Sequence, residues 1–262
     1  MFNRYLEIGA VCSRGLKKTT NQDNIVALVG EFNNKEFGIF AVADGVGGMD
    51  FGEFASGYTI CCIKRWWDTR IKILIVKPKP LKKLIVQVNK ELEELIKDIN
   101  NDIFQYGISH GLKGGTTLSL VFIYDNSFIL KHTGDSRIYM FAGELLQLTK
   151  DQSWVEREVD KGIFTKEQAE LNPMRNILTM CLGVFTDLKL QSLLGFLPRG
   201  AVFILCSDGL YRYFNASDIK TEIAVLKADA ESSAQDIANK LLKKVISKGA
   251  HDNISIIIVK PI

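Results

Sequence analysis

The sequence AVADGVGGMDFGEFAS, residues 41–56, ends an apolar run on a carboxylate. The run is apolar as far as Ala43, Asp44 breaks it, and glycines occupy three of the next four positions. The apolar and β-branched residues before Asp44 predict a buried strand, Phe37–Ala43, that ends there. A charged group at such a place is costly unless it has a partner, which indicates a role for Asp44 beyond packing.

The composition is that of a folded globular protein. The chain has 262 residues, of which 47% are hydrophobic and 24% are charged, and its formal net charge is only +3. This balance argues against disorder and against a nucleic-acid-binding surface. The longest apolar runs, such as Ile254–Val259, are far shorter than the ~20 residues of a membrane-spanning helix, so we expect no membrane insertion. No clear internal boundary divides the sequence, and we predict one domain over residues 1–262.

The cysteines indicate a reducing compartment. They are Cys12, Cys61, Cys62, Cys181 and Cys206. No two of them form a CxxC pair, and four stand in apolar surroundings, so we expect buried free thiols. The N-terminal sequence includes Glu7 and lacks a continuous apolar core, which argues against a signal peptide. These features predict a cytoplasmic protein.

Strands and helices are predicted in separate clusters along the chain. Segments rich in β-branched and aromatic residues predict strands at Phe37–Ala43, Thr117–Tyr124, Phe128–His132, Arg137–Ala142, Ala201–Cys206 and Ile254–Val259. Apolar residues three and four apart predict helices over residues 52–68, 81–106 and 233–247, with a helical insert near 152–171. Because the elements do not alternate one by one, an α+β fold with sheets covered by helices is favoured over a doubly wound parallel sheet.

Other aspartates stand where the predicted strands meet loops. Asp208 follows the strand FILC, Asp135 lies in a tight GDS turn between two strands, Asp252 precedes the final strand, and Asp23 opens an apolar run. For any one of them the simpler interpretation is a turn, since aspartate next to glycine is a common turn signal. Together, carboxylates gathered at sheet ends without basic partners repel one another and need a cation.

The ligand types favour Mg²⁺ or Mn²⁺ at these aspartates. Oxygen ligands suit hard divalent ions, and no His or Cys pair stands at zinc-ligand spacing. The glycines after Asp44 then let a backbone carbonyl and a substrate approach the metal. Two such ions lower the pKa of a bridging water and neutralise a phosphoryl group. The residues therefore predict a dimetal hydrolase, in the first place a phosphatase.

Eight blocks follow one another along the chain: TTNQDN, VADGVGGMDFGEFAS, GGTTLSLVF, HTGDSRIYMF, LTKDQSWVEREVDKG, NPMRNILTMCLG, LCSDGL and HDNISIIIV. In this order they resemble the metal-dependent protein phosphatases, the type-2C serine/threonine phosphatases, and above all the bacterial branch that opposes eukaryotic-like Ser/Thr kinases. The resemblance runs from about residue 9 to residue 259, and the first of these blocks begins at Thr19. The resemblance implies a β-sandwich of two antiparallel sheets flanked by helices, with a metal site at one edge.

The resemblance also implies roles for single residues. Asp44 would bridge two central Mn²⁺ or Mg²⁺ ions, the Gly45 carbonyl would ligate one of them, and Asp208 and Asp252 would complete the other. Asp135 together with Asp208 would form a third metal site. The predicted catalytic residues are thus Asp44, Asp208 and Asp252.

Two further residues are expected to support these ligands. Asp23 would lie behind the ligands and hold metal-bound water. Asn253, next to Asp252, would act as an orienting group. Of the histidines, His251 is interpreted as a loop residue whose part in catalysis stays open, and His132 as structural.

The chain departs from the family pattern at three places. Many members have an arginine that holds the substrate phosphate where this chain has Lys18, with Arg14 four residues upstream as a substitute at the wrong spacing. Gln22 replaces a glutamate. Met49 stands where a histidine often follows the glycines, so no histidine near Asp44 protonates the leaving group. A metal-bound water would then do so, or poor leaving groups would turn over slowly.

The predicted function is a Mg²⁺- or Mn²⁺-dependent protein serine/threonine phosphatase. We expect a monomer that acts on phosphorylated proteins and opposes a cognate Ser/Thr kinase. Residues 150–182 match the flap segment beside the active site, either a mobile lid or a packed pair of surface helices. The alternatives are a catalytically weak or dead scaffold, a regulatory phosphatase for one dedicated partner, and a nucleotide or sugar-phosphate hydrolase.

Overall fold

The computed structural model describes residues 5–47, 49–77, 79–228 and 232–262. Within these ranges the strands are β1 (Leu6–Ser13), β2 (Asp23–Phe32), β3 (Lys35–Gly47), β4 (Gly114–Thr116), β5 (Leu118–Tyr124), β6 (Ser127–Thr133), β7 (Arg137–Phe141), β8 (Leu145–Gln147), β9 (Gln191–Phe196), β10 (Val202–Cys206) and β11 (Ile254–Pro261). The helices are α1 (Met49–Trp66), α2 (Lys72–Val76), α3 (Leu81–His110), α4 (Trp154–Asp160), α5 (Lys166–Leu171), α6 (Asp208–Tyr211), α7 (Ala216–Ala228) and α8 (Ala234–Ser247). A π-helical turn, Trp67–Ile71, joins α1 to α2.

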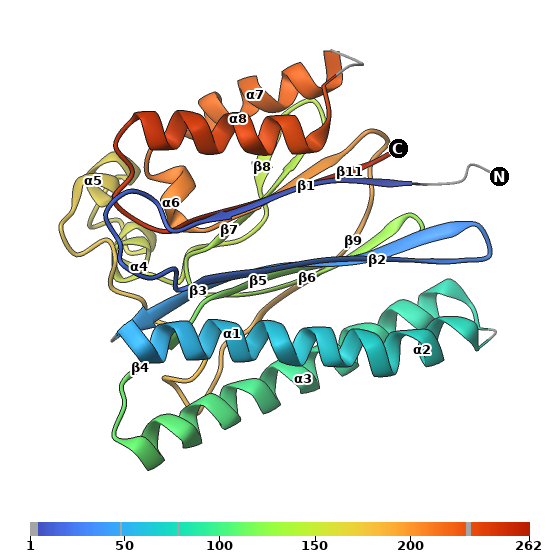
Figure 1. Cartoon of the computed structure of the whole chain (residues 1–262), viewed down its shortest axis with the longest axis horizontal. Coiled ribbons are helices and arrows are strands. Elements are labelled where there is room, and N and C mark those ends of the chain that lie inside the picture. Colours follow the sequence, from blue (N-terminus) through green and yellow to red (C-terminus); the bar gives the residue numbers. More distant parts are fainter. Residues whose placement is uncertain (1–4, 48, 78, 229–231) are drawn as a thin grey trace.

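These elements form two sheets packed between two layers of helices (Figure 1). One sheet has the strand order β1-β11-β10-β7-β8, and the other has the order β2-β3-β5-β6-β9 with β4 paired to β3. The pairings are antiparallel. Helices α7 and α8 cover the outer face of the first sheet, and α1, α2 and α3 cover that of the second. The predicted fold class, an α+β sandwich of two antiparallel sheets flanked by helices, is confirmed.

Burial of both sheet faces explains why the central strands have continuous apolar sequences. Successive side chains of a strand point to opposite faces. In β3, Ile39 packs toward the helices and Phe40 packs between the two sheets. In β10, Ile204 belongs to the cluster under α7 and α8, whereas Phe203 lies between the sheets.

The three predicted long helices are present, with shifted ends. Helix α3 extends to His110 and ends at Gly111, whose φ of 65° is left-handed. Helix α8 begins after Ser233, whose hydroxyl accepts a hydrogen bond from the Asp236 N–H. The predicted helix 52–68 corresponds to α1 and continues into the π-helical turn. None of the helices in the described ranges combines the length and apolar character needed to cross a bilayer.

The strands that the sequence analysis did not identify are mostly edge strands. β1 and β8 are the edges of one sheet, and β2 and β9 are the edges of the other. An edge strand has fewer buried positions, and in β9 every residue is at least partly exposed. Burial therefore does not mark β9 as a strand, whereas the apolar run of β2 was noted in the sequence without being interpreted as a strand.

The predicted end of a strand at Asp44 is wrong. β3 runs from Lys35 to Gly47 and contains Asp44. It pairs with β5 as far as Val42, and from Gly45 onward it pairs with β4. The apolar sequence stops because the strand changes its partner and leaves the region between the sheets.

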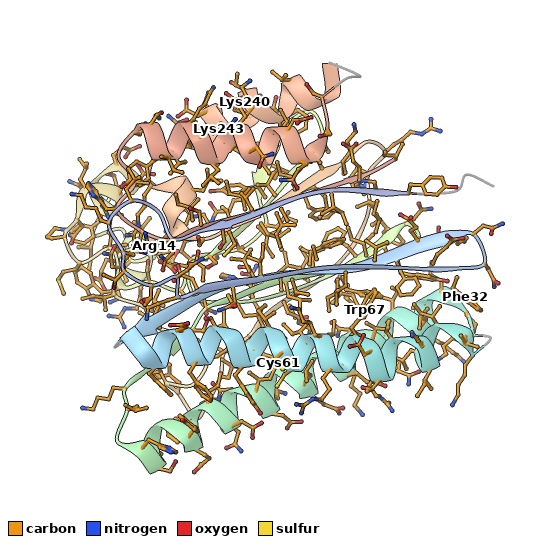
Figure 2. The ribbon with its side chains drawn as sticks, viewed as in Figure 1. Arg14, Phe32, Cys61, Trp67, Lys240 and Lys243 are labelled. Atoms are coloured by element: carbon orange, nitrogen blue, oxygen red, sulfur yellow. The ribbon has the colours of Figure 1, made fainter. Side chains whose placement is uncertain are left out.

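The expectation of four buried thiols is also wrong. Cys62, Cys181 and Cys206 are buried, whereas Cys12 and Cys61 are exposed, and all five thiols are free. Figure 2 places Cys61 on α1. An apolar neighbour in sequence does not fix which side of an amphipathic helix a residue occupies.

His132 is a buried imidazole in β6. Its Nδ1 lies 2.9 Å from Ser119 Oγ and its Nε2 lies 3.2 Å from the Lys150 carbonyl oxygen. Its side chain is fully buried. Burial lowers the pKa of His132 from its usual 6.5 to about 4. The interpretation of His132 as a structural residue agrees with these contacts.

We predict that His132 makes folding stability depend on pH. The folded state excludes a proton that the unfolded chain binds below about pH 6.5, so stability falls as pH falls toward 4. Between pH 7.5 and pH 5, the wild type should lose about 2 kcal/mol more than His132→Gln, measured by urea unfolding. The exposed His110→Gln is the control and should keep the wild-type pH dependence. Equal pH dependence in wild type and His132→Gln would show that His132 does not titrate in this way.

Candidate active site

The predicted site residues come from elements that meet at one end of the sandwich. In Figure 1 the loop between β1 and β2, helix α6 and the end of β3 lie at the end that also carries α4 and α5. Figure 2 shows Arg14 of that loop at this end, whereas Phe32 at the tip of β2 lies at the opposite end. Segments far apart in sequence are thereby brought to a common region.

Backbone hydrogen bonds fix the position of Asp44. Its N–H donates to Thr117 Oγ1 over 3.0 Å. Its carbonyl accepts from the Thr117 N–H over 2.8 Å and from Thr116 Oγ1 over 3.0 Å. Asp44 stands directly opposite Asp23 of β2 in the ladder. Like charges opposite each other destabilise a strand pair, so these two carboxylates need a compensating interaction.

Asp23 receives part of that compensation from a neighbouring hydroxyl. Ser207 Oγ donates to Asp23 Oδ2 over 2.7 Å and accepts from the Ser255 N–H over 3.0 Å. The other carboxylate oxygen, Asp23 Oδ1, is buried and has no hydrogen-bond partner. Burial raises the pKa of Asp23 to about 7. One oxygen of Asp23 is thus free to receive a ligand.

The glycines of residues 41–56 allow a close contact between β3 and α1. A Cβ atom at Gly45 would lie 2.3 Å from the Gly52 carbonyl oxygen, and one at Gly52 would lie 2.5 Å from Gln22 Nε2. Gly47 has a φ of 111° and lies against Gly114. Backbone packing therefore requires these glycines independently of any ligand, a reason that the sequence analysis missed.

Asp208 and Asp252 are brought together by a second close contact. Asp208 begins α6 just after β10, and Asp252 lies just before β11. A Cβ atom at Gly209 would lie 1.9 Å from the Asn253 carbonyl oxygen, so glycine is needed where the two segments meet. Arg212 bridges the two carboxylates, because its guanidinium contacts Asp208 Oδ2 and its Nη1 lies 3.7 Å from Asp252 Oδ2.

Arg212 is not among the site residues predicted from the sequence. Its signal was the spacing, since residues four apart on a helix share a face and Arg212 is four residues after Asp208. Lys18, the predicted phosphate-binding residue, also faces this region, with its Nζ 2.9 Å from Asp252 Oδ1. The hydrogen bond to Asp252 is the main cause that raises the pKa of Lys18.

Asp135 lies in the turn between β6 and β7, as predicted. The Tyr211 hydroxyl donates to Asp135 Oδ2 over 3.3 Å. The Arg137 guanidinium lies 3.7 Å from the centre of the Tyr211 ring and pairs with Asp151 over 2.7 Å. Tyr211 and Arg137 thus position Asp135, and neither residue was singled out from the sequence.

Contacts link five aspartates in one region, the aspartate cluster: Asp23, Asp44, Asp135, Asp208 and Asp252. Burial raises the pKa of Asp44 well above its usual value, and the negative charges of the other four raise it further. Burial likewise raises the pKa of Asp135 to about 7 and that of Asp208 to about 6. The cluster is therefore short of positive charge.

The aspartate cluster fits a divalent cation in its chemistry. All its donors are oxygen atoms, which hard cations prefer, and the buried Asp23 Oδ1 lacks a partner. A cation would also relieve the repulsion that raises the pKa values. Over the described part of the chain, no three His, Cys, Asp or Glu side chains are grouped closely enough to hold one ion by themselves. Arg212 and Lys18 contact two of the carboxylates here, so a metal at those positions has to compete with them.

Asn253 holds the loop that carries Lys18. Its Oδ1 accepts from the Gln22 N–H over 2.9 Å, and its Nδ2 donates to the carbonyls of Arg14 and Thr20 over 3.0 and 3.1 Å. These three side-chain contacts go to loop backbone, and the Asn253 N–H donates to Asp252 Oδ1 over 2.9 Å, so Asn253 contacts both the loop and the Asp252 carboxylate.

The structure also places the other residues at which the chain departs from the family pattern. Arg14 Nη1 donates to the Thr19 carbonyl over 3.2 Å, within its own loop. The Gln22 carbonyl accepts from the Gly45 N–H over 3.1 Å, which ties this position to β3. The Met49 side chain lies outside the described residues. His251 is exposed.

The predicted flap segment, residues 150–182, contains α4 and α5 on either side of Gly162, close to the expected positions. The Gln152 N–H donates to the Gly134 carbonyl over 2.7 Å, and the Gln152 side chain accepts from the Gly134 N–H over 2.9 Å. The segment is thereby attached to the turn that carries Asp135.

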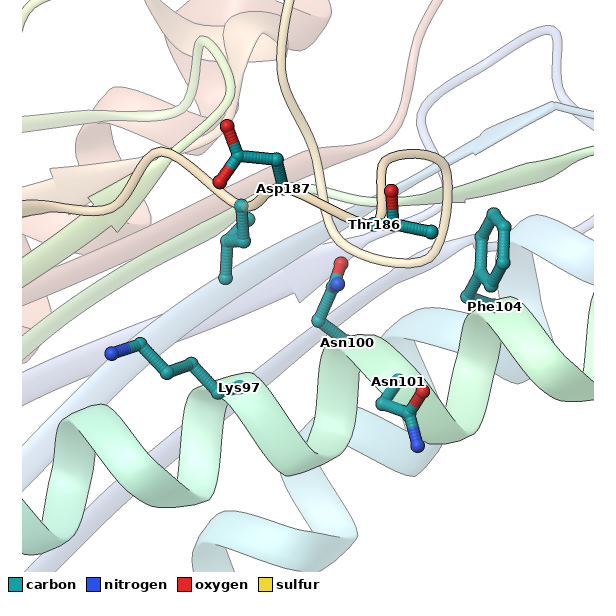
Figure 3. A pocket seen from close by; sticks show the side chains of 7 residues that line it. Lys97, Asn100, Asn101, Phe104, Thr186 and Asp187 are labelled. Carbon is teal, nitrogen blue, oxygen red and sulfur yellow. The ribbon is translucent and has the colours of Figure 1, made fainter.

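A separate pocket of about 260 Å³ lies between α3 and the loop at residues 186–188. Figure 3 shows Lys97, Asn100, Asn101 and Phe104 on the helix and Thr186 and Asp187 on the loop. Asn100 connects the two sides, since its Nδ2 donates to the Phe185 carbonyl over 2.9 Å. None of the lining residues belongs to the aspartate cluster, so this pocket is not part of the candidate site.

Comparison with known proteins identifies the family. The profile of the family Stage II sporulation protein E (SpoIIE) matches residues 163–261. Protein phosphatase PhpP of Streptococcus pneumoniae is 30% identical over 257 residues, which are 97% of each chain. A putative protein phosphatase 2C-type of Streptococcus pyogenes is 31% identical over 250 residues, which are 94% of this chain and 93% of its own. The chain belongs to the protein phosphatase 2C family. The family resemblance seen in the sequence motifs is thus confirmed.

Solved structures of bacterial phosphatases from this family have the same architecture. A serine/threonine phosphatase of Streptococcus agalactiae has a TM-score of 0.84 and 28% identity, covering 97% of this chain and 99% of its own. The catalytic domain of the phosphatase PstP, in complex with two manganese ions, has a TM-score of 0.80 and 25% identity, covering 99% of both chains.

We predict that Asn253→Ala loosens the loop that carries Lys18. The substitution removes the acceptor of the buried Gln22 N–H, and leaving such a donor without this partner costs about 1–3 kcal/mol. Urea unfolding should show this loss, and hydrogen exchange at the Gln22 amide should accelerate. Asn239→Ala, on the exposed side of α8, is the control and should change neither quantity. Unchanged exchange at Gln22 in Asn253→Ala would contradict the assigned role.

Proposed function

We propose that this chain hydrolyses phosphoserine and phosphothreonine monoesters in proteins, using divalent cations held by the aspartate cluster. The observation that carries the proposal is geometric. Asp44 stands opposite Asp23 in the β2–β3 ladder, Ser207 next to Asp208 donates to Asp23, and Arg212 contacts both Asp208 and Asp252. Membership of the protein phosphatase 2C family supports it, as does the presence of two manganese ions in the related PstP structure.

In this proposal each ligand has a rigid backbone support. Asp44 and the Gly45 carbonyl are carried by the hydrogen-bonded end of β3, and Asp208 and Asp252 are carried by the contact at Gly209. Ligands fixed in this way need little reorganisation when a substrate binds. Divalent cations bound there lower the pKa of water and neutralise charge on the phosphoryl group.

The remaining polar groups have supporting tasks in the proposal. Asp23 orients a water through its free Oδ1, and Ser207 keeps its other oxygen in place. Lys18 binds the substrate phosphate as a point charge, without the bidentate geometry of an arginine. Asp135, held by Tyr211, contributes with Asp208 to a third cation site.

We further propose a physiological setting that follows the sequence-based expectations. The 262 residues act as one domain and as a monomer in the cytoplasm, and they oppose a cognate Ser/Thr protein kinase. Mn²⁺ or Mg²⁺ serves as the cation. Retention of all the predicted metal aspartates argues against a dead scaffold.

We predict that activity depends strictly on the cations and on Asp208. Hydrolysis of an aryl phosphate and of a phosphothreonine peptide should require added Mn²⁺ or Mg²⁺ and should stop with EDTA. Asp208→Asn should lower kcat at least about 100-fold, because losing a ligand exceeds the effect of losing an outer partner. Asp98→Asn, on the exposed face of α3, is the matched control and should keep full activity.

Hydrolysis of either substrate that persists in EDTA would contradict the proposed mechanism. Near-normal activity of Asp208→Asn, with a native circular dichroism spectrum, would remove Asp208 from the site. Metal-dependent activity on the aryl phosphate but on no phosphopeptide would favour a small-molecule hydrolase.

We predict that Lys18 affects substrate binding more than turnover. Its side chain is 43% exposed, so Lys18→Ala should raise KM only roughly two- to fivefold and leave kcat nearly unchanged. Lys18→Arg supplies a bidentate donor and should lower KM. Lys17→Ala removes a neighbouring charge on the same loop and serves as the control. A KM that is the same in Lys18→Ala and wild type argues against a phosphate contact.

A further inference from the structure

Arg212 is placed directly against the carboxylates that are proposed to bind metal. Its guanidinium contacts Asp208 Oδ2, and its Nη1 lies 3.7 Å from Asp252 Oδ2. Its side chain is only 18% exposed. The position is set by α6, since the Arg212 N–H donates to the Asp208 carbonyl over 3.1 Å and closes the helical turn.

The guanidinium is a permanent charge in this position. Arginine cannot lose its proton in proteins, so Arg212 can leave the carboxylates only by moving. The aspartate cluster is desolvated, and a cation is required to offset the repulsion within it. Arg212 supplies that charge from within the chain.

A divalent ion and a guanidinium compete for the same carboxylate oxygen. Both are cations, and in a site of reduced dielectric their repulsion is strong. A metal that Asp208 holds through Oδ2 therefore competes directly with Arg212 for that oxygen. Lys18, the other cation at Asp252, has a side chain that is 43% exposed, so it can leave Asp252 for solvent more easily than Arg212 can leave Asp208.

We propose that Arg212 is an internal counter-ion of the aspartate cluster, which divalent cations must displace from Asp208 and Asp252, so that Arg212 sets the affinity for the metal. The inference rests on the proposed function because it takes these two aspartates as metal ligands. It implies that the chain binds its metal more weakly than the carboxylates alone would, and that metal-free protein is held in a charge-compensated form.

The test measures Mn²⁺ binding directly, without an activity assay. Isothermal titration calorimetry, and the electron paramagnetic resonance signal of free Mn²⁺, are recorded for wild type, Arg212→Gln and Lys17→Gln. Arg212→Gln should bind Mn²⁺ roughly tenfold more tightly, since a displaced charge-assisted contact opposes binding by an amount of this order. Lys17→Gln removes the same charge from an exposed site nearby and should change the Kd much less. An Arg212→Gln protein that is folded and binds Mn²⁺ no more tightly than wild type overturns the inference.

A measurement on the wild type keeps the inference testable if Arg212→Gln fails to fold. The Arg212 Nε–H resonance is followed by nuclear magnetic resonance while Mg²⁺ is added. Displacement predicts a large shift that saturates with metal binding, and a resonance that stays unchanged at saturating Mg²⁺ overturns the inference. The two proposals fail separately: a wild type that binds no metal refutes the proposed function, whereas normal metal binding that ignores Arg212 refutes only this inference.

Discussion

Repulsion among carboxylates that the fold holds in a desolvated region is the constraint on which the site and its surroundings depend. Separate segments bring these groups together, and burial raises the pKa values of Asp23 and Asp135 to about 7. Such an arrangement is unfavourable unless positive charge is supplied, either by side chains or by bound cations. The contacts of Lys18 and Arg212 are the part of this compensation that the chain provides itself. The oxygen-only donors make divalent metals the natural external supply.

The sandwich supplies the rigidity that this constraint demands. The backbone N–H and the carbonyl of Asp44 both form hydrogen bonds with Thr117. The ladder of β2 and β3 fixes Asp23 opposite Asp44. Helix α1 packs so tightly on β3 that Gly45 and Gly52 have no space for side chains. The carboxylates therefore cannot relieve their repulsion by moving apart through the backbone. The fold thus holds the carboxylates in positions that are unfavourable without a cation and that are preorganised to bind one.

Much of this arrangement could be predicted from the sequence, because its strongest signals are local. Apolar runs identify strands that are buried on both faces, and aspartates beside glycines identify where those strands meet loops. The edge strand β9 was missed because every one of its residues is at least partly exposed, whereas the apolar run after Asp23 was noted without being interpreted as the edge strand β2. Asp44 was placed at the end of a strand because the change of partner from β5 to β4 depends on distant residues. Arg212 was missed for a related reason. Its place in the site depends on its contact with Asp252, which is remote in sequence.

We propose that the aspartate cluster would hold divalent cations, with Asp44 as one of the residues that hold them. The most direct measurement is the stoichiometry of Mn²⁺ binding, determined by isothermal titration calorimetry for wild type and Asp44→Asn under identical conditions. The account predicts at least two ions per chain in the wild type, and loss of at least one of them in a folded Asp44→Asn protein. A folded Asp44→Asn protein that binds as many ions as the wild type, with unchanged affinity, would contradict it.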